Sequence, residues 1–380
     1  MGEIFYTFFR IGLVGFGGPI ALISLIEQEV CQNKKWVTTE KFAEIFSICK
    51  LLPGPFAVQV AICCGYQKSG RIGGFVAGVA FLLPALVLII LLGFLYVHGL
   101  NTKSTHLRLV FEYMQDATLA VILITVFALG KLYIKNITSI IILISSIIFV
   151  WLHPSFEPIV IVAFGLLGIL WSYRSKLSNK ASNLPAIFTT PSFVHDLSLS
   201  VIFYSDKLFK IFWICIKAGE FSFGTGLAII PLLHADLVTN FHWLTEQQFL
   251  DGITLGQITP GPSTVSIVFF GFVIAGIPGL LISLIGFYLP PMFNSLVLIP
   301  LFWQKMAKSN NLKIFTNWAF PAVIGGILSA TIKLGIVAVN SYIDVILVLL
   351  SLFILYKKLL PVWALIPLCG ATGFIASYIY

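Results

Sequence analysis

Charged side chains are scarce in this chain, and their scarcity excludes an ordinary water-soluble protein. Only 10% of the 380 residues are Asp, Glu, Lys or Arg, whereas soluble domains carry about 25%. Hydrophobic residues make up 58% of the sequence, and the mean hydropathy is +1.01. They gather in apolar runs of about 17 to 25 residues, each long enough to cross a bilayer as a helix. We therefore predict a polytopic membrane protein.

The short alternating segments that are typical of transmembrane β-barrels are missing, so we predict an all-α fold. The apolar runs fill most of the chain and leave no room for a soluble catalytic domain. Residues 1–9 lack the basic stretch that begins a signal peptide, and they lead directly into an apolar run. We interpret that run as the first membrane segment.

Motifs for catalysis, metal binding and nucleotide binding are absent as well. The sequence contains no CxxC pair, no HExxH motif and no GxxxxGK[ST] loop. Its six cysteines fall mostly in apolar runs, which favours buried thiols. The prediction is therefore a protein that is not an enzyme, holds no metal or other cofactor, and is not driven directly by a nucleotide. The net charge of +8 comes mainly from short loops, so it indicates membrane orientation rather than a nucleic-acid partner.

A repeat is visible when the sequence is compared with itself. At an offset of 207 residues, glycine, proline, tryptophan and acidic positions coincide in order and spacing. The aligned pairs are Phe16-Gly17 with Phe223-Gly224, Trp36 with Trp243, Phe42 with Phe249, Glu44 with Asp251, and Pro53-Gly54-Pro55 with Pro260-Gly261-Pro262. The prediction is a first repeat over 1–173, a polar cytoplasmic connector over 174–206, and a second repeat over 207–380.

Each repeat is expected to hold five or six membrane segments. A first span (about 5–26 and 211–233) precedes a segment that is broken at Pro-Gly-Pro (40–66 and 247–272), and a third span (72–97 and 279–301) follows. Drawing the broken segment as a re-entrant helix pair places nearly all lysines and arginines, including Lys68, Lys207 and Lys210, on the inner face. The resulting odd number of crossings inverts the second repeat, as is typical of secondary transporters.

The two Pro-Gly-Pro sequences predict helix ends at membrane depth. Proline removes amide donors, and a new helix begun at Pro55 leaves the amides of Phe56, Ala57 and Val58 free to bind an anion. The second copy adds hydroxyl groups at Ser263, Thr264 and Ser266. Such backbone is tolerated only where it lines protein or a wet cavity. A plain proline kink is the alternative interpretation.

The Phe16-Gly17-Gly18-Pro19 and Phe223-Gly224-Thr225-Gly226 segments interrupt the two first spans in the same way. They could line the substrate pathway. They could equally allow two helices to pack closely through small residues.

Charges within the spans are the remaining candidates. Arg10 and Lys217 align with each other and could draw in an oxyanion, although snorkelling to the lipid headgroups is the alternative. Lys50 precedes the first Pro-Gly-Pro where Gln257 precedes the second, and both side chains could donate to bound oxygen. Lys333 has no partner that the sequence identifies.

Three acids are candidates for proton coupling: Glu220, Glu44 and Asp251. A carboxyl group in a dry site can exchange protons near neutral pH. For Glu220 the alternative is a structural ion pair with Lys217, three residues earlier. For Glu44 and Asp251, which lie near loops, the alternative is a solvated surface position.

The motifs around these residues resemble those of the chromate ion transporter family, in its two-domain form. The resemblance rests on Phe16-Gly17-Gly18-Pro19, Trp36, Leu51-Leu52-Pro53-Gly54-Pro55, Gly65-Tyr66, Gly70, Gly73 and Phe81-Leu82-Leu83-Pro84, with Gly256-Gln257 and Thr259-Pro260-Gly261-Pro262 in the second half. It covers essentially the whole chain. Two positions depart from the family pattern: Lys50 stands where glutamine is common, and Thr225 where glycine is expected.

The resemblance implies a multi-pass protein of the bacterial inner membrane that exports chromate by antiport with protons. Alternatives are a carrier for sulfate or an organic anion, an uncoupled anion channel, and a membrane-embedded interaction subunit that does not transport by itself. The expected partners are the oxyanion, protons and the lipid bilayer, with a homodimer left open. The candidate substrate-binding residues are Arg10, Phe16, Gly17, Gly18, Lys50, Pro53, Gly54, Pro55, Phe56, Ala57, Lys217, Phe223, Gly224, Gln257, Pro260, Gly261, Pro262, Ser263 and Thr264.

Overall fold

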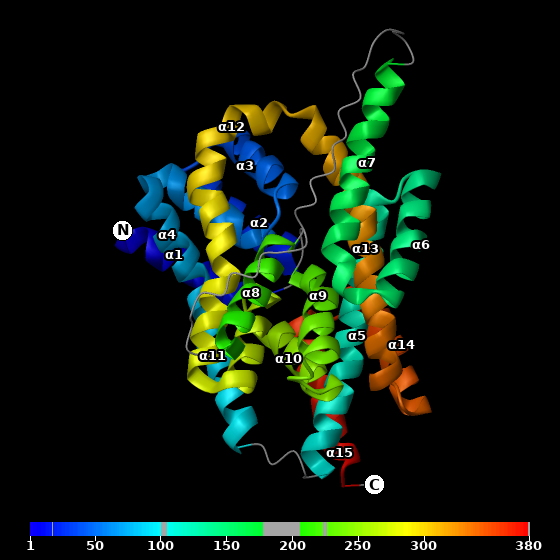
Figure 1. The fold of residues 1–380 in the computed structure, drawn as a ribbon. Helices are drawn as coiled ribbons and strands as arrows, with labels where there is room; N and C mark the ends of the chain where they lie inside the picture. The colour runs from blue at the N-terminus through cyan, green and yellow to red at the C-terminus, as the bar shows by residue number, and fades with distance from the viewer. Residues whose placement is uncertain (17, 100–104, 178–205, 223–225, 379–380) are drawn as a thin grey trace.

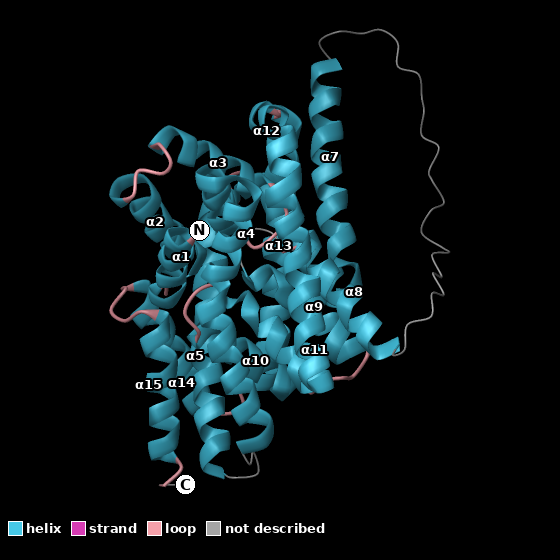
Figure 2. Ribbon diagram, turned by 90° about the vertical axis from the view of Figure 1, so that its left-hand side faces the viewer, coloured by secondary structure: helices cyan, strands magenta, loops and turns pink. Residues whose placement is uncertain are grey.

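The structure is a computed structural model that describes residues 1–16, 18–99, 105–177, 206–222 and 226–378. All regular secondary structure in these ranges is helical (Figures 1 and 2). Within these ranges, five helices are long and apolar enough to cross a membrane, and they are joined by shorter apolar helices. The predicted all-α polytopic fold is therefore confirmed. The predicted connector over 174–206 lies largely outside the described residues.

The first half of the chain begins with short helices and continues into long ones. Its helices are α1 (Gly2–Val14), α2 (Gly18–Glu27), η1 (Gln28–Asn33), α3 (Thr39–Leu51), α4 (Phe56–Phe94), η2 (Leu95–Gly99), α5 (Thr105–Tyr133), α6 (Ile137–Leu152), η3 (Pro154–Phe156) and α7 (Glu157–Leu177).

The second half has a similar order of helices. They are α8 (Asp206–Glu220), η4 (Gly226–Ile229), α9 (Ile230–His234), η5 (Ala235–Asn240), α10 (Glu246–Ile258), η6 (Ser263–Val265), α11 (Ser266–Phe293), η7 (Asn294–Leu298), α12 (Ile299–Lys308), α13 (Asn310–Ala338), α14 (Tyr342–Tyr356) and α15 (Val362–Ala376). Relative to the first half, α12 is added after η7, and η3 has no counterpart. Helices α5 and α13 both have 29 residues.

The first span is a hairpin, not the single crossing that the sequence predicted. Helix α1 ends at Val14 and α2 starts at Gly18, after which the chain returns to the beginning of α1. Lys34 Nζ lies 3.1 Å from Glu3 Oε1. An ion pair between these residues places both ends of the hairpin on one face of the protein. The expected crossing over 5–26 was therefore wrong, because the break in the helix allows the chain to reverse.

The corresponding part of the second half is also a hairpin, which corrects the predicted side of two lysines. The ammonium groups of Lys207 and Lys210, at the start of α8, lie 5.6 and 5.8 Å from the rings of Trp243 and Phe241, which follow η5. The Lys207 ammonium also donates to the carbonyl of Ile274. The prediction had placed these lysines opposite that loop. The segment over 211–233 thus returns to the face on which it started.

Each Pro-Gly-Pro segment forms the tip of the predicted re-entrant helix pair. Helix α3 starts at a Thr38 cap and α10 at a Thr245 capping box, and both helices end just before the prolines. These caps satisfy backbone amides at the outer ends of the hairpins. The chain then continues into α4 and α11.

Helices α4 and α11 each contain a second reversal at a glycine with positive φ. Gly70 has a φ of 63° and Gly276 a φ of 62°. Gly65 and Gly73, eight residues apart, are so close that a Cβ atom on Gly65 would lie 2.5 Å from the Gly73 carbonyl oxygen. A straight helix would separate them by about 12 Å. The first part of each helix therefore folds back, and the second part becomes a long span.

The long spans pack tightly against the first hairpins through glycine. A Cβ atom on Gly12 of α1 would lie 2.3 Å from the carbonyl oxygen of Phe81 in α4, and one on Gly219 of α8 would lie 2.2 Å from that of Phe287 in α11. Only glycine permits this approach. These two crossings fix both hairpins beside the long spans and bring their tips to the centre of the protein.

Candidate functional site

The tips of the hairpins are joined across the two halves of the chain by a reciprocal pair of backbone hydrogen bonds. The amide of Gly54 donates to the carbonyl oxygen of Ser222 over 2.9 Å. The amide of Gly261 donates to the carbonyl oxygen of Gly15 over 2.7 Å. The repeat offset aligns Gly54 with Gly261 and Gly15 with Ser222. The hairpin tip of each half is thus anchored to the broken first segment of the other.

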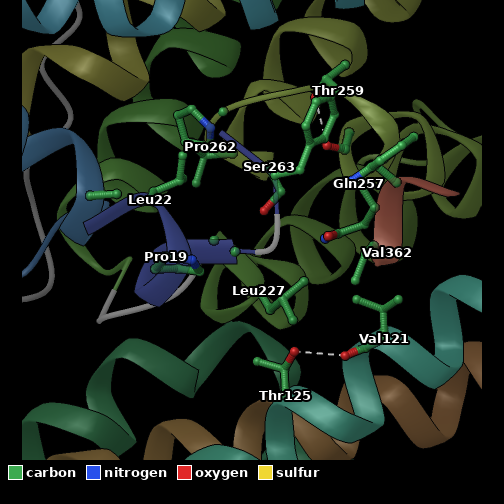
Figure 3. Close-up of a pocket in the computed structure, with 18 of the residues that line it drawn as sticks. Pro19, Leu22, Val121, Thr125, Leu227, Gln257, Thr259, Pro262, Ser263 and Val362 are labelled. Carbon is green, nitrogen blue, oxygen red and sulfur yellow. Dashed lines mark hydrogen bonds between the residues drawn. The ribbon is translucent and has the colours of Figure 1, made fainter. Parts of the chain in front are cut away.

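A cavity of about 240 Å³ lies at this junction (Figure 3). We call it the central pocket. It is lined from both halves by Phe16, Gly18, Pro19, Leu22, Pro55, Phe56, Ala57, Val121, Ile124, Thr125, Gly226, Leu227, Gly256, Gln257, Thr259, Gly261, Pro262, Ser263, Thr264, Leu355, Val362 and Trp363.

Four helix N-termini border the central pocket. Helix α2 begins at Gly18, α4 at Phe56, η4 at Gly226 and η6 at Ser263, and all four residues line the cavity. A helix N-terminus presents unpaired amide hydrogens and carries about half a positive elementary charge. Four such ends around one cavity make it electropositive without a charged side chain. The arrangement suits an anion.

Two amides at each Pro-Gly-Pro tip have no backbone acceptor within the described part of the chain. They belong to Phe56 and Ala57 in α4, and to Ser263 and Thr264 at the start of η6. The Val58 amide donates to the Pro55 carbonyl over 3.0 Å. The prediction that the Val58 amide is free was therefore wrong, because the first turn of α4 tightens and closes this bond.

The side chains of the central pocket are uncharged. Ser263 and Gln257 point toward the same space in Figure 3, and Leu227, Val121 and Val362 form apolar walls around it. Other hydroxyl groups are already engaged. Thr125 donates to the Val121 carbonyl over 2.8 Å, and Thr259 donates to the Gly256 carbonyl, also over 2.8 Å. These bonds direct two hydroxyl hydrogens to the helix backbone, whereas the Ser263 hydroxyl faces the cavity.

Ten of the predicted substrate-binding residues line the central pocket. They are Phe16, Gly18, Pro55, Phe56, Ala57, Gln257, Gly261, Pro262, Ser263 and Thr264. Three others support it from behind. Gly54 forms the bond to Ser222, the Pro53 carbonyl accepts from Gln59 Nε2 over 2.6 Å, and Pro260 begins the second tip. Gly17, Phe223 and Gly224 lie outside the described residues.

The three predicted cations do not line the central pocket. Arg10 is exposed on α1. Lys217 forms an ion pair with Asp236, with 2.5 Å between Nζ and Oδ2. Lys50 lines a separate cavity of about 500 Å³ near the ends of α3 and α5. Arg10 and Lys217 align in sequence, but one is exposed and the other is paired with a carboxylate.

The predicted acids also occupy three different surroundings. Glu220 accepts a hydrogen bond of 3.3 Å from Asn294, and the alternative ion pair with Lys217 is not formed. Glu44 is exposed and pairs with Lys41 over 2.9 Å. The third acid, Asp251, is buried.

Asp251 is held by two donors from the first half of the chain. The hydroxyl of Tyr96 and the amide of Gln115 each donate to its carboxylate over 2.7 Å. Its side chain borders an open cavity of about 650 Å³ that also contains Arg108 and Glu112. Since α10 carries both Asp251 and the pocket-lining Gln257, the acid lies between this outer cavity and the central pocket.

Sequence reasoning missed the walls that come from other helices. Val121, Ile124 and Thr125 are on α5, Leu355 is on α14, and Val362 and Trp363 are at the start of α15. These residues are ordinary members of apolar runs, and no local pattern marks them. Pro19 and Gly226 were not missed, because both belong to the two interrupted segments that the sequence analysis named as possible lining of the substrate pathway.

Lys333, which the sequence left without a partner, donates to the backbone carbonyl of Trp151 over 3.0 Å. Its ammonium also lies 5.2 Å from the centre of the Trp151 ring. These contacts give the charge a structural role between α13 and α6, away from the central pocket.

Comparison with known proteins gives a consistent result. The pattern of the chromate transporter family matches residues 2–169 and again residues 209–374. The chain is 31% identical over 365 residues to a chromate transport protein of Cupriavidus metallidurans, covering 94% of this chain and 88% of that protein. It is 29% identical over 376 residues to a probable chromate transport protein of Synechococcus elongatus, covering 97% and 93%.

A chromate transport protein of Pseudomonas aeruginosa is 27% identical over 346 residues, covering 88% of this chain and 80% of that protein. No solved structure matches the chain. The matched family is one of transporters, in agreement with the prediction that the protein is not an enzyme. With a family match over most of the sequence and the several apolar helices described above, this multi-pass membrane protein belongs to the chromate transporter family.

Proposed function

We propose that the protein carries a small inorganic oxyanion, most specifically chromate, through the central pocket. The observation that carries this proposal is the convergence of four helix N-termini on a cavity lined by uncharged side chains. The relatives named as chromate transport proteins support chromate as the substrate.

Backbone amides suit an ion that must be released again. The unpaired amides of Phe56, Ala57, Ser263 and Thr264 and the Ser263 hydroxyl would surround the oxygen atoms of a tetrahedral dianion. A buried lysine or arginine would bind a dianion more strongly and hold it longer. Transport requires binding that is favourable enough for entry and weak enough for exit.

We further propose that the two halves are inversely oriented repeats that open the pocket to alternate faces. The reciprocal bonds of Gly54 with Ser222 and of Gly261 with Gly15 support this, since they have the form expected of a pseudo-twofold relationship. In Figure 1, α7 extends toward one end of the molecule and α15 toward the other. Rocking of one hairpin pair against the other would expose the pocket to each side in turn.

Proton coupling is assigned to Asp251 in this proposal. The acid is buried, it joins α10 to α5 through Gln115, and it borders the outer cavity. Protonation would weaken its hydrogen bonds with Tyr96 and Gln115 and so change how α10 is held. Glu44 is exposed and paired with Lys41, so its proton would not affect the pocket. Glu220 contacts Asn294 behind the first tip and is a second position for the proton.

The basic residues indicate which face of the protein lies in the cytoplasm. Lys34, Lys35, Lys68 and Arg71 lie near the outer ends of the first two hairpins, and the positive-inside rule assigns this face to the cytoplasm. We propose export from the cytoplasm across a bacterial inner membrane, with protons entering in exchange.

Two other functions use the same site. A carrier for sulfate or an organic anion differs only in the ion that fills the central pocket, because sulfate has the same shape and charge as chromate. An uncoupled anion channel would use the same four helix ends but would pass ions without protons. The proposed function and these two alternatives predict different ion fluxes in a single vesicle experiment.

The test is reconstitution of the purified protein into vesicles with an imposed proton gradient. Uptake of chromate, sulfate, a small organic anion and chloride is measured with and without the gradient. Chromate flux that rises with the gradient supports the proposal. Sulfate or organic-anion flux in its place supports the other carriers, gradient-independent current supports a channel, and the absence of any oxyanion flux refutes the proposal.

A further inference from the structure

A second cavity beside the central pocket carries two lysines and no acid. It has a volume of about 500 Å³ and lies between α3, α5, α6, α7 and α13. Lys50 and Lys135 line it, together with Asn136, Asn317, Trp171 and Trp318. We call it the lysine cavity. None of the acids in the described part of the chain is among its lining residues.

Neither of these two lysines has a counter-ion among the residues that the structure describes. Lys34, Lys41, Lys210 and Lys217 all form ion pairs with carboxylates, whereas Lys50 and Lys135 form none within the described residues. Two like charges that line one cavity repel each other. An anion between them would remove this repulsion, and a dianion would neutralise both lysines.

Lys50 is also held in place by aromatic rings. Its ammonium lies 5.2 Å from the centre of the Tyr133 ring, and that ring stacks on Phe320 with 3.9 Å between centroids. A lysine above an aromatic face keeps its charge and loses part of its freedom. The positive end is therefore directed at the cavity before any anion arrives.

The lysine cavity and the central pocket lie along the same helix. Thr125 of α5 lines the central pocket, and Tyr133 of the same helix lines the lysine cavity. Eight residues of α-helix span about 12 Å. Lys50 itself stands three residues before Pro53, at the first hairpin tip. An ion in the lysine cavity would thus lie about 12 Å from the central pocket along α5.

The outer cavity beside Asp251 lies at the other end of α5 and has the opposite charge pattern, so we also call it the acidic cavity. It contains the acids Asp251 and Glu112, and its one basic residue, Arg108, is bound to Glu112 over 2.7 Å. An offset of 205 residues aligns Lys135 with Asn340, which lines this acidic cavity. The same offset aligns Glu112 with Asn317 of the lysine cavity. At the first pair of aligned positions, the lysine cavity has a lysine and the acidic cavity an asparagine. At the second pair, the lysine cavity has an asparagine and the acidic cavity a glutamate.

We propose that the lysine cavity is a second anion-binding site, which holds one tetrahedral dianion between Lys50 and Lys135 and delivers it to the central pocket. The side-chain amides of Asn136 and Asn317 complete the site. The acidic cavity beyond Asp251 repels the same ion, so an ion that leaves there does not readily return. This inference rests on the proposed oxyanion transport, but its binding step can be measured separately.

The first experiment measures binding without transport. Sulfate is titrated into the full-length protein in lipid-free detergent, with calorimetry as the readout. The wild type is expected to bind two sulfate ions, and the Lys50→Gln, Lys135→Gln double variant only one. Each single variant should weaken the second site by about threefold to tenfold. Lys131→Gln is the matched control, because it removes the same charge from α5 at a position that does not line the cavity. An unchanged stoichiometry in the double variant overturns the proposal.

The second experiment separates loading from the central step. The vesicles are oriented so that added chromate reaches the side of the protein that carries the lysine cavity. Relative to the wild type, the double variant should have a KM for chromate that is about tenfold higher or more, and a kcat within about twofold. Lys50→Arg and Lys135→Arg should restore a low KM. A lower kcat with an unchanged KM refutes the loading role.

A third experiment determines whether the cavity binds a free ion or the phosphate group of a lipid, since both are tetrahedral anions. Sulfate titrations are repeated in nanodiscs with and without anionic phospholipid. Loss of the second sulfate site with anionic lipid would show that a lipid headgroup occupies the cavity, and it would refute loading. If chromate flux is absent while two sulfate ions still bind, the proposed function fails and the second site stands.

Discussion

The amide of Gly54 donates a hydrogen bond of 2.9 Å to the carbonyl of Ser222, a residue in the other half of the chain. The aligned residues Gly261 and Gly15 form the matching bond over 2.7 Å. Each bond places a Pro-Gly-Pro tip against a broken helix that lies more than 150 residues away in sequence. The central pocket therefore exists only when both halves are folded together.

Gly54→Ala should disrupt this junction. Gly54 has a φ of 127°, and an added Cβ atom would lie 2.4 Å from Gln59 Nε2. Strain of this kind typically costs about 1–3 kcal/mol. We expect a lower melting temperature and loss of chromate flux, measured by a thermal-shift assay and in vesicles. Gly70→Ala is the control: its φ is also positive, but nothing lies within 4 Å. Equal flux in the two variants would contradict the assignment.

Ser263→Ala should weaken substrate binding without unfolding the protein. The Ser263 hydroxyl faces the central pocket, and one lost hydrogen bond corresponds to about a threefold to tenfold rise in KM. Chromate uptake at a series of concentrations gives the KM. A KM equal to that of the wild type would remove this hydroxyl from the site.

Arg10→Gln should leave transport unchanged, contrary to the expectation from sequence. Arg10 is exposed and does not line the central pocket. Initial rates of chromate uptake, compared at equal protein amounts, provide the test. A clear rise in KM would show that the charge acts on the ion from a distance.

Asp251→Asn should uncouple transport from the proton gradient. The substituted amide cannot release a proton, so chromate flux with and without an imposed gradient should become equal. Glu44→Gln is the matched control because that acid is exposed and paired with Lys41. Gel filtration verifies that both variants fold. Retained gradient dependence in Asp251→Asn would transfer the role to Glu220 or another acid.

Inverse orientation of the two halves predicts opposite labelling of two equivalent turns. Lys68→Cys and Ile274→Cys should react with membrane-impermeant thiol reagents from opposite faces of sealed vesicles. The five native cysteines other than Cys31 are buried, so background labelling should be low. Reaction of both positions from one face would contradict the inverted arrangement.

The sequence predicted the parts of the site that depend on local backbone chemistry. Pro53, Gly54 and Pro55 cannot continue a helix, so a break at that point could be placed without a structure. A new helix was expected to begin at Pro55 for the same reason, and in the structure Pro55 is the N-cap of a helix that begins at Phe56. These residues line or support the central pocket as a direct result of their restricted backbone.

The errors concern long-range geometry. Nothing near Val14 or Gly18 specifies whether a broken helix continues or turns back, and that choice depends on packing such as the approach of Gly12 to Phe81. Arg10 and Lys217 align in sequence, but a different neighbour, Asp236, takes up the second charge. The walls from α5, α14 and α15 were not predictable, because Val121 or Val362 resembles any other apolar residue in a membrane helix.

The absence of charged side chains from the central pocket has a consequence for how this transporter can change. In the proposed binding mode, main-chain amides hold the ion, and most substitutions leave the course of the main chain unchanged. Variants that abolish function should therefore cluster at glycine and proline, whereas exchanges at Val121, Leu227 or Gln257 should adjust which ion fits. Selection could then redirect such a protein to a new oxyanion in single steps without passing through an inactive form.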